Sequence, residues 1–160
     1  MSDNPYAPPK ARVGEPVARG LTEAPPEARL YSSLQIAAAT FIGSPLIGGW
    51  LIAANHKTLA RPEQANQAII LSVVVTLALI GLGIVLPERF PRVALSVAGA
   101  VGFRAWAETR FSIVLEKHRA AGGSLFSWWR VVGLALLAAA IVFTVAVTLV
   151  AVYSVVVTRE

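Results

Sequence analysis

Residues 34–54 read LQIAAATFIGSPLIGGWLIAA, and this stretch decides the class of the fold. It has about the length that an α-helix, rising 1.5 Å per residue, needs to cross roughly 30 Å of hydrocarbon. Residues 67–86 and 131–157 are apolar runs that meet the same criterion. The sequence therefore predicts an all-α integral membrane protein, a helical bundle with three transmembrane helices, or four if a shorter segment also crosses.

The composition of the whole chain agrees with a membrane class. Hydrophobic side chains make up 56% of the 160 residues and charged ones only 14%, and the mean hydropathy is +0.64. The absence of cysteine excludes disulfide frameworks and cysteine-ligated metal sites. The net charge of +5 comes from residues that flank the apolar runs. We therefore expect the basic residues to face anionic lipid headgroups of a bilayer, and no nucleic acid as a partner.

Residues 1–29 are polar and rich in proline, with acidic and basic side chains in balance. Such a segment has too little apolar surface to offset the entropy of ordering, so we expect a disordered cytoplasmic tail followed by a membrane domain at residues 30–160. The tail lacks the short apolar stretch and small-residue cleavage site of a signal peptide. The first apolar run should therefore be an uncleaved anchor.

The first run is interrupted in its middle. Pro45 removes one backbone hydrogen bond, which predicts a kink in a continuous helix. Thr40, Ser44 and Gly48 recur every four residues and form a strip of small residues where another helix could approach closely. A kinked helix could also line a substrate pathway, but the other half of the chain has no second interrupted helix, so helix packing is favoured.

Residues typical of the membrane interface flank the last run, and a loop precedes it. The interface anchors are Trp128, Trp129, Arg130 and Tyr153. The preceding Gly122-Gly123-Ser124 lacks the second spaced glycine and the lysine of a phosphate-binding loop, so it is interpreted as a flexible turn.

Residues 93–119 are the open question. Their uninterrupted apolar part, residues 93–103, reaches only about 16 Å and falls short of a crossing. A full span would include Arg104 and Glu108, and one charge at a helix centre costs about 2.5–3.5 kcal/mol. These two residues lie one turn apart and could form a polar pair. The remainder has separate polar and apolar faces, which predicts an amphipathic helix at the interface or beneath the other helices.

The distribution of Lys and Arg separates three spans from four. With three spans, every basic residue except Lys57, Arg61 and Arg159 lies on one side of the membrane, whereas four spans divide the basic residues equally. The positive-inside rule therefore favours three spans, with the N-terminus cytoplasmic and the C-terminus outside.

No known catalytic pattern is present. The runs at residues 34–54, 67–86 and 131–157 contain no carboxylate, histidine, lysine or arginine that could relay protons. His56 and His118 lack the further ligands of a metal site and are interpreted as solvated surface residues. We expect a protein that is not an enzyme and has no catalytic, metal or cofactor-binding residues.

Several motifs together resemble a known type of protein. They are Asn4-Pro5-Tyr6-Ala7-Pro8-Pro9, FIGSPLIGG at residues 41–49, LPERFP at residues 86–91, and AAGGS at residues 120–124 followed by SWWRVVG at residues 127–133. With them the chain resembles uncharacterised small polytopic bacterial inner-membrane proteins that have an Asn-Pro-Tyr-x-Pro-Pro N-terminal tail. The resemblance implies a multi-pass protein of the bacterial inner membrane and carries over no functional residue.

Two functions remain open. We favour a non-enzymatic inner-membrane protein that acts through helix–helix contacts, by self-association or with another membrane protein, or through a cytoplasmic partner. The alternative is a small transporter or channel subunit, with a pathway near the kinked first helix and the Arg104/Glu108 pair.

Overall fold

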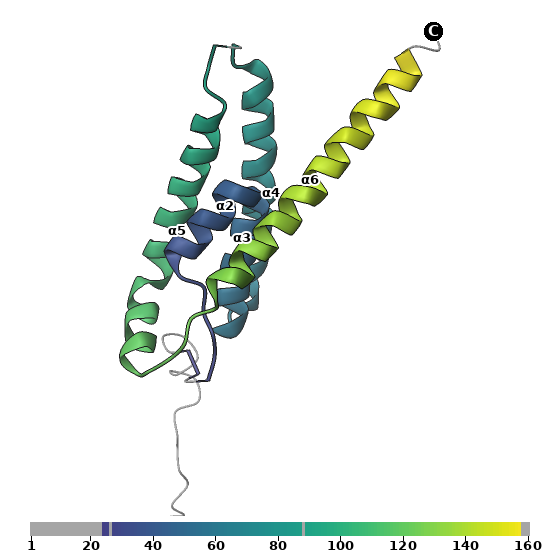
Figure 1. The fold of residues 1–160 in the computed structure, drawn as a ribbon. Helices are drawn as coiled ribbons and strands as arrows, with labels where there is room; N and C mark the ends of the chain where they lie inside the picture. The colour runs from purple at the N-terminus through teal and green to yellow at the C-terminus, as the bar shows by residue number, and fades with distance from the viewer. Residues whose placement is uncertain (1–23, 26, 88, 158–160) are drawn as a thin grey trace, which may run out of the picture.

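The computed structural model describes residues 24–25, 27–87 and 89–157, without the side chains of residues 84, 145–146, 149–150 and 152–157. The described part consists of helices α2 (Ser33–Gly43), α3 (Pro45–Thr58), α4 (Pro62–Val85), α5 (Val93–Ala120) and α6 (Trp128–Val157), with no strand (Figure 1). The predicted all-α class is confirmed. Most of the predicted disordered tail lies outside the described residues, as does the side chain of Tyr153.

The first apolar run forms two helices, and the prediction of one kinked helix over residues 34–54 was wrong. Helix α2 ends at Gly43, Ser44 has a φ of 139°, and Pro45 is the first residue of α3. Proline has no N–H to continue the first helix, yet its fixed φ suits the first position of a new one. The chain therefore stops and restarts at this point.

The two helices fold back on each other, and Asn55 joins their open ends. Its Oδ1 accepts a hydrogen bond of 2.8 Å from the backbone N–H of Tyr31, and its Nδ2 donates one of 2.8 Å to the Tyr31 carbonyl. Tyr31 precedes α2 and Asn55 lies in the last turns of α3. Residues 33–58 therefore form a helical hairpin, called the hairpin below, whose tip is Gly43-Ser44-Pro45.

Small residues let the hairpin close and pack. A Cβ atom at Gly48 would collide with the Thr40 hydroxyl across the hairpin, and one at Gly49 would collide with Ser72 of α4. Glycine is the residue that permits such close helix–helix approach.

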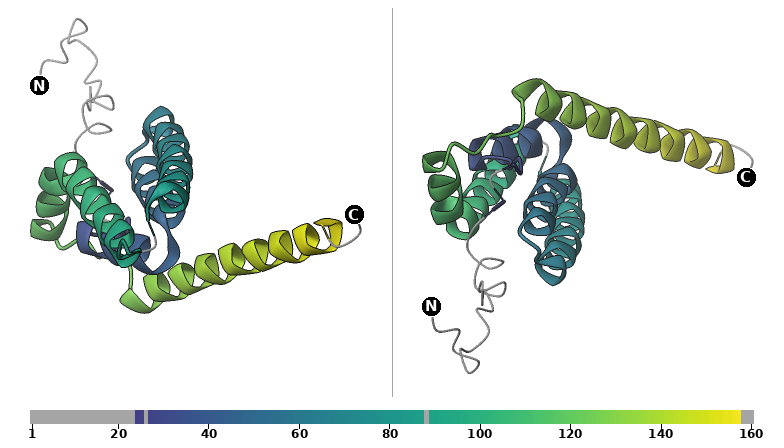
Figure 2. Two further views of the ribbon diagram at one scale, coloured as in Figure 1. Left: turned by 90° about the horizontal axis from the view of Figure 1, so that it is seen from above. Right: turned by 90° about the horizontal axis from the view of Figure 1, so that it is seen from below.

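The remaining helices surround the hairpin. Helix α3 packs along α4, while α2 packs against α5 and α6. Residues 86–92 connect α4 to α5 at the end of the molecule that is uppermost in Figure 1, and α5 then runs back in the opposite direction. Helix α6 starts beside α2 and then diverges from the other helices over most of its length, as Figure 2 also shows.

The core lies around the open end of the hairpin. It includes Leu30, Tyr31, Ile36, Leu51, Ile52, Leu59, Phe103, Phe111 and Val131. Tyr31 stacks on Phe126 at 4.2 Å between ring centroids, and the Phe126 N–H donates to the Leu30 carbonyl at 3.0 Å. The segment before α2 is thus fixed to the segment before α6.

Away from this core, large apolar side chains have no cover. Val85 is 82% exposed, Leu77 63% and Phe143 70%. Among the described helices, the stretch Pro62–Gly83 of α4 is the one that is long and apolar enough by itself to cross a membrane. Ser33–Gly43 and Trp128–Thr144 are shorter apolar helical stretches.

Candidate functional site

A polar groove runs between the beginning of α2 and the second half of α5. Its volume is about 650 Å³, and its lining residues are Ser33, Glu108, Thr109, Ser112, Leu115, Glu116 and Arg119. All of these except Leu115 have a polar side chain, although carbon atoms make up the larger part of the lining surface. Glu108, Ser112 and Glu116 are spaced four residues apart and therefore share one face of α5. We call this hollow the polar groove.

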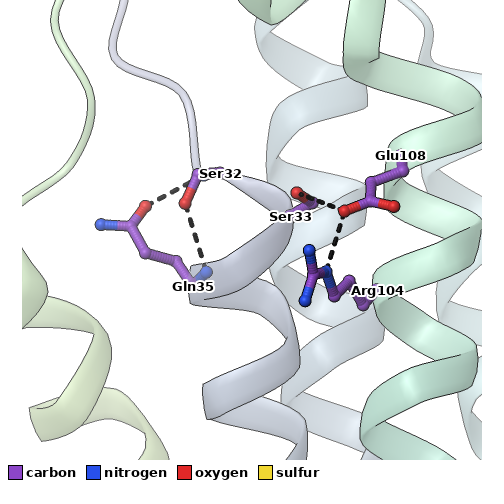
Figure 3. A network of polar contacts seen from close by, with 5 residues as sticks. All are labelled: Ser32, Ser33, Gln35, Arg104 and Glu108. Atoms are coloured by element: carbon purple, nitrogen blue, oxygen red, sulfur yellow. Dashed lines mark hydrogen bonds and ion pairs between the residues drawn. The ribbon is translucent and has the colours of Figure 1, made fainter.

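An ion pair lies at one end of the polar groove. The Nε of Arg104 donates to Oε1 of Glu108 at 2.8 Å, and the Ser33 hydroxyl donates to the same oxygen at 3.4 Å (Figure 3). The Arg104 and Glu108 side chains are 53% and 47% exposed. Because both are half in solvent, the pair contributes at most about 1 kcal/mol to stability. Its effect is to fix the position of one carboxylate oxygen.

The start of α2 positions Ser33 against Glu108. The Ser32 hydroxyl accepts from the Gln35 N–H at 3.2 Å, and the Gln35 side chain accepts from the Ser32 N–H at 2.9 Å, which makes a complete capping box (Figure 3). Gln35 also donates to the Phe126 carbonyl at 2.7 Å. These bonds fix the first turn of α2, whose positive dipole end favours a carboxylate.

The strip of Thr40, Ser44 and Gly48 is distributed over the hairpin instead of one helix face. Thr40 and Gly48 face each other between α2 and α3, and the Thr40 hydroxyl donates to the Ile36 carbonyl at 2.8 Å. Ser44 lies at the tip, where its hydroxyl oxygen is buried without a hydrogen-bond partner among the described residues. Pro45 is the first residue of α3.

The predicted interface anchors whose side chains the structure describes lie at the start of α6. Trp128 and Trp129 are exposed, and the Arg130 guanidinium lies 4.6 Å from the centre of the Phe126 ring. A cation above an aromatic face is attracted by the ring quadrupole. Arg130 therefore contributes to the junction between the segments before α2 and α6.

The interpretation of both histidines as solvated was wrong. His56 is only 3% exposed, and its ring centre lies 4.8 Å from that of Phe111. Burial, followed by the charges of Arg61 and Arg110, lowers the pKa of His56 to about 4. A spacing of four residues from the buried Ile52 was the sequence signal for its inward position.

His118 is also buried, near the end of α5. Its Nε2 lies 3.3 Å from the Ser124 carbonyl oxygen. It continues an apolar face through Phe111, Val114 and Leu115, at helical spacing, and that pattern was readable in the sequence. Both histidines are thus parts of the packed core.

The groove offers side chains for polar contacts. Within the described residues, no three His, Cys, Asp or Glu side chains are grouped so that they could hold a metal ion. No protein-family model matches the chain, and neither the curated proteins nor the solved structures include a significant match.

Proposed function

We propose that the protein is integral to the bacterial inner membrane and acts without catalysis, by binding another membrane protein or a second copy through the polar groove. The observation that carries the proposal is the division of the surface. The first half of α5 and most of α4 expose apolar side chains, whereas the second half of α5 exposes the polar groove. Uncovered apolar surface of this extent is typical of membrane or protein contact.

The hairpin gives this proposal a specific topology. Because Asn55 joins the two ends of the hairpin, residues 33–58 would enter from the cytoplasm and return to it, and α4, α5 and α6 would cross. Arg89, Arg92 and Arg159 then lie outside and Arg104 lies within the membrane, while all other Lys and Arg residues lie on the cytoplasmic side. That asymmetry supports a cytoplasmic N-terminus and an outside C-terminus.

The same topology supports a protein partner over the groove. Arg104 is eleven residues into α5, about 16 Å below its first residue. A half-exposed ion pair at that depth is costly against lipid tails and is usually covered by protein. Polar groups of a second helix could bond to the exposed side chains of Ser112 and Glu116 in the groove.

Single-cysteine labelling tests the topology, since the chain has no cysteine of its own. Lys57→Cys and Arg89→Cys place a thiol at exposed positions beyond α4's two ends. A membrane-impermeant maleimide added to intact spheroplasts should label position 89, and position 57 only after permeabilisation. The parent chain, which has no cysteine and should not react with the maleimide, is the control. The reverse pattern would restore residues 34–54 as a crossing helix, and extraction of the protein by alkaline carbonate would refute membrane integration.

In-cell photocrosslinking tests the partner. A photoreactive residue at Ser112, inside the groove, should form an adduct with a protein, and Glu108→Lys should reduce it because the carboxylate is reversed in charge. Ile113 is one residue further on α5 and 66% exposed outside the groove, so the same probe there is the matched control. Equal adducts from positions 112 and 113 would refute the groove as the contact.

A transporter or channel subunit is the second candidate. It is favoured by the broken helix pair, at whose tip the Ser44 hydroxyl is buried without a partner among the described residues, because interrupted helices also line transport pathways. A second hollow lies at the tip of the hairpin. Among the described residues, none lines both this hollow and the polar groove, so the two do not form one pathway, which is evidence against transport. If reconstituted vesicles show a flux that Glu108→Gln abolishes while expression stays intact, the transporter function would replace the interaction proposal.

A further inference from the structure

A second hollow of about 340 Å³ lies at the tip of the hairpin, between α4, α5 and α6. Residues 40–45 line it on the hairpin side, and Leu79, Leu95 and Val142 line it from the three helices. We call this hollow the tip cavity. Its surface is mainly apolar, and Arg92 is the one charged side chain among the described residues that line it.

The charge and the apolar surface lie at different depths. Arg92 directly precedes α5, on the connection from α4, and is exposed. Gly99 lines the cavity seven residues further along, about 10 Å deeper. The cavity therefore extends from a guanidinium near the 86–92 connection to an apolar interior bounded by the hairpin tip.

We propose that the tip cavity binds an acyl chain of an anionic lipid whose phosphate pairs with Arg92. An alkyl chain matches the apolar interior, and a guanidinium can bind two phosphate oxygens at once. The inference rests on the proposed membrane topology, which places Arg92 at the outer interface and the interior among lipid tails. Phosphatidylcholine with the same chains would fill the interior and also carries a phosphate, but its quaternary ammonium offsets that charge, so only the anionic lipid brings net negative charge to Arg92.

Two glycines of α5 provide a matched pair of variants. A Cβ at Gly99 would lie 3.5 Å from the Leu79 side chain and 3.9 Å from Pro45, in ordinary contact, so the rest of a leucine would occupy the tip cavity. A Cβ at Gly102 would have no neighbour within 4 Å. Gly99→Leu should therefore exclude the chain, whereas Gly102→Leu changes helix propensity equally without filling the cavity.

The test is photolabelling in nanodiscs with phosphatidylglycerol or phosphatidylcholine that carries the same photoreactive acyl chain. We expect phosphatidylglycerol to label the cavity-lining peptides several-fold more than phosphatidylcholine does. The Gly99→Leu variant should lose this labelling several-fold, whereas the Gly102→Leu variant should keep it. Equal labelling by the two lipids, or full labelling of a folded Gly99→Leu variant, would overturn the proposal.

The headgroup contact is tested separately at exposed residues, whose substitution leaves packing intact. Arg92→Gln should reduce labelling by phosphatidylglycerol to the level of phosphatidylcholine, while Arg89→Gln, which does not line the cavity, should preserve the difference. Excess inorganic phosphate should not compete, and competition would identify free phosphate as the ligand and overturn the lipid assignment. The labelling of positions 57 and 89 in spheroplasts, described above, reports the topology independently, so a protein with the expected labelling pattern but without lipid preference refutes only this inference.

Discussion

The buried side-chain amide of Asn55 holds the open end of the hairpin together. It is 1% exposed and satisfies both backbone polar groups of Tyr31. Replacement by alanine would leave a buried N–H and a buried carbonyl unpaired, each at a cost of about 1–3 kcal/mol. We expect Asn55→Ala to lower the free energy of unfolding in detergent by about 2 kcal/mol or more, measured by chemical denaturation.

Asn66→Ala is the control for that measurement, because Asn66 is exposed on α4. It should change the free energy of unfolding by less than about 0.5 kcal/mol. Equal stability of the two variants would show that the Asn55 bonds do not hold the hairpin closed.

His56 makes stability depend on pH at the open end of the hairpin. The unfolded chain has the ordinary histidine pKa of 6.5, whereas burial and then the charges of Arg61 and Arg110 lower the pKa to about 4 in the folded protein. Between these values the unfolded state binds a proton that the folded state does not. The free energy of unfolding attributable to His56 should therefore fall as the pH drops from 6.5 toward 4, and stay constant above 6.5.

Denaturation curves recorded across this pH range check the prediction. His56→Gln removes the titrating ring and should flatten this part of the profile. A variant profile as steep as that of the unmodified protein would assign the pH dependence to other groups.

At the scale of the elements, the contact between α2 and α3 depends on Gly48. Alanine inside a helix is usually more stable than glycine by about 0.5–1 kcal/mol. At Gly48 the added Cβ would collide with the Thr40 hydroxyl and the Phe103 ring, and overpacking costs about 1–3 kcal/mol. We expect Gly48→Ala to destabilise the protein, as seen in its thermal unfolding midpoint.

Gly102→Ala should change the same midpoint in the opposite direction, because its Cβ would meet open space in α5. Thr40→Ala combined with Gly48→Ala should recover part of the loss. If both single glycine variants were stabilised, the close approach of α2 and α3 would be refuted.

The helix positions were largely readable from the sequence. Residues 67–86, 93–119 and 131–157 correspond to α4, α5 and α6 with differences of a few residues at their ends. Long apolar runs bounded by proline, glycine and charged residues specify such boundaries locally. The fold-back at Ser44 was not readable, since a kink and a reversal have the same local sequence. The bonds that distinguish them join Tyr31 and Asn55, 24 residues apart.

The polar groove was readable only on its α5 side. The spacing of Arg104 and Glu108 predicted a pair, and the structure brings them to 2.8 Å. Ser33, which completes the contact, is 75 residues from Glu108 in the chain. No periodicity connects residues so far apart, because their meeting depends on how α2 packs on α5.

At the scale of the whole molecule, Phe126 links the segment before α2 to the start of α6. Its ring stacks on Tyr31, Arg130 lies over it, and its backbone bonds to Leu30 and Gln35. Complete burial of a phenylalanine makes its loss cost about 3–5 kcal/mol. Phe126 is partly buried, so we expect Phe126→Ala to cost about 2 kcal/mol and to increase proteolysis in the 121–127 connection.

Trp129→Ala is the control for this junction, because Trp129 is 86% exposed. It should leave stability in detergent unchanged to within about 0.5 kcal/mol. Limited proteolysis followed by mass spectrometry measures both variants. Equal protection of the 121–127 connection in both would show that Phe126 does not hold it.

The junction at Phe126 also has a consequence for the order of events during synthesis. The Asn55 bonds can form as soon as α3 has left the ribosome, because they connect neighbouring parts of the chain. The bond from Gln35 to Phe126 joins residues 91 positions apart, so it must wait until residue 126 has been translated. While α4 and α5 are being synthesised, the nascent protein therefore already contains the closed hairpin, with one side uncovered. That side is covered when residue 126 arrives.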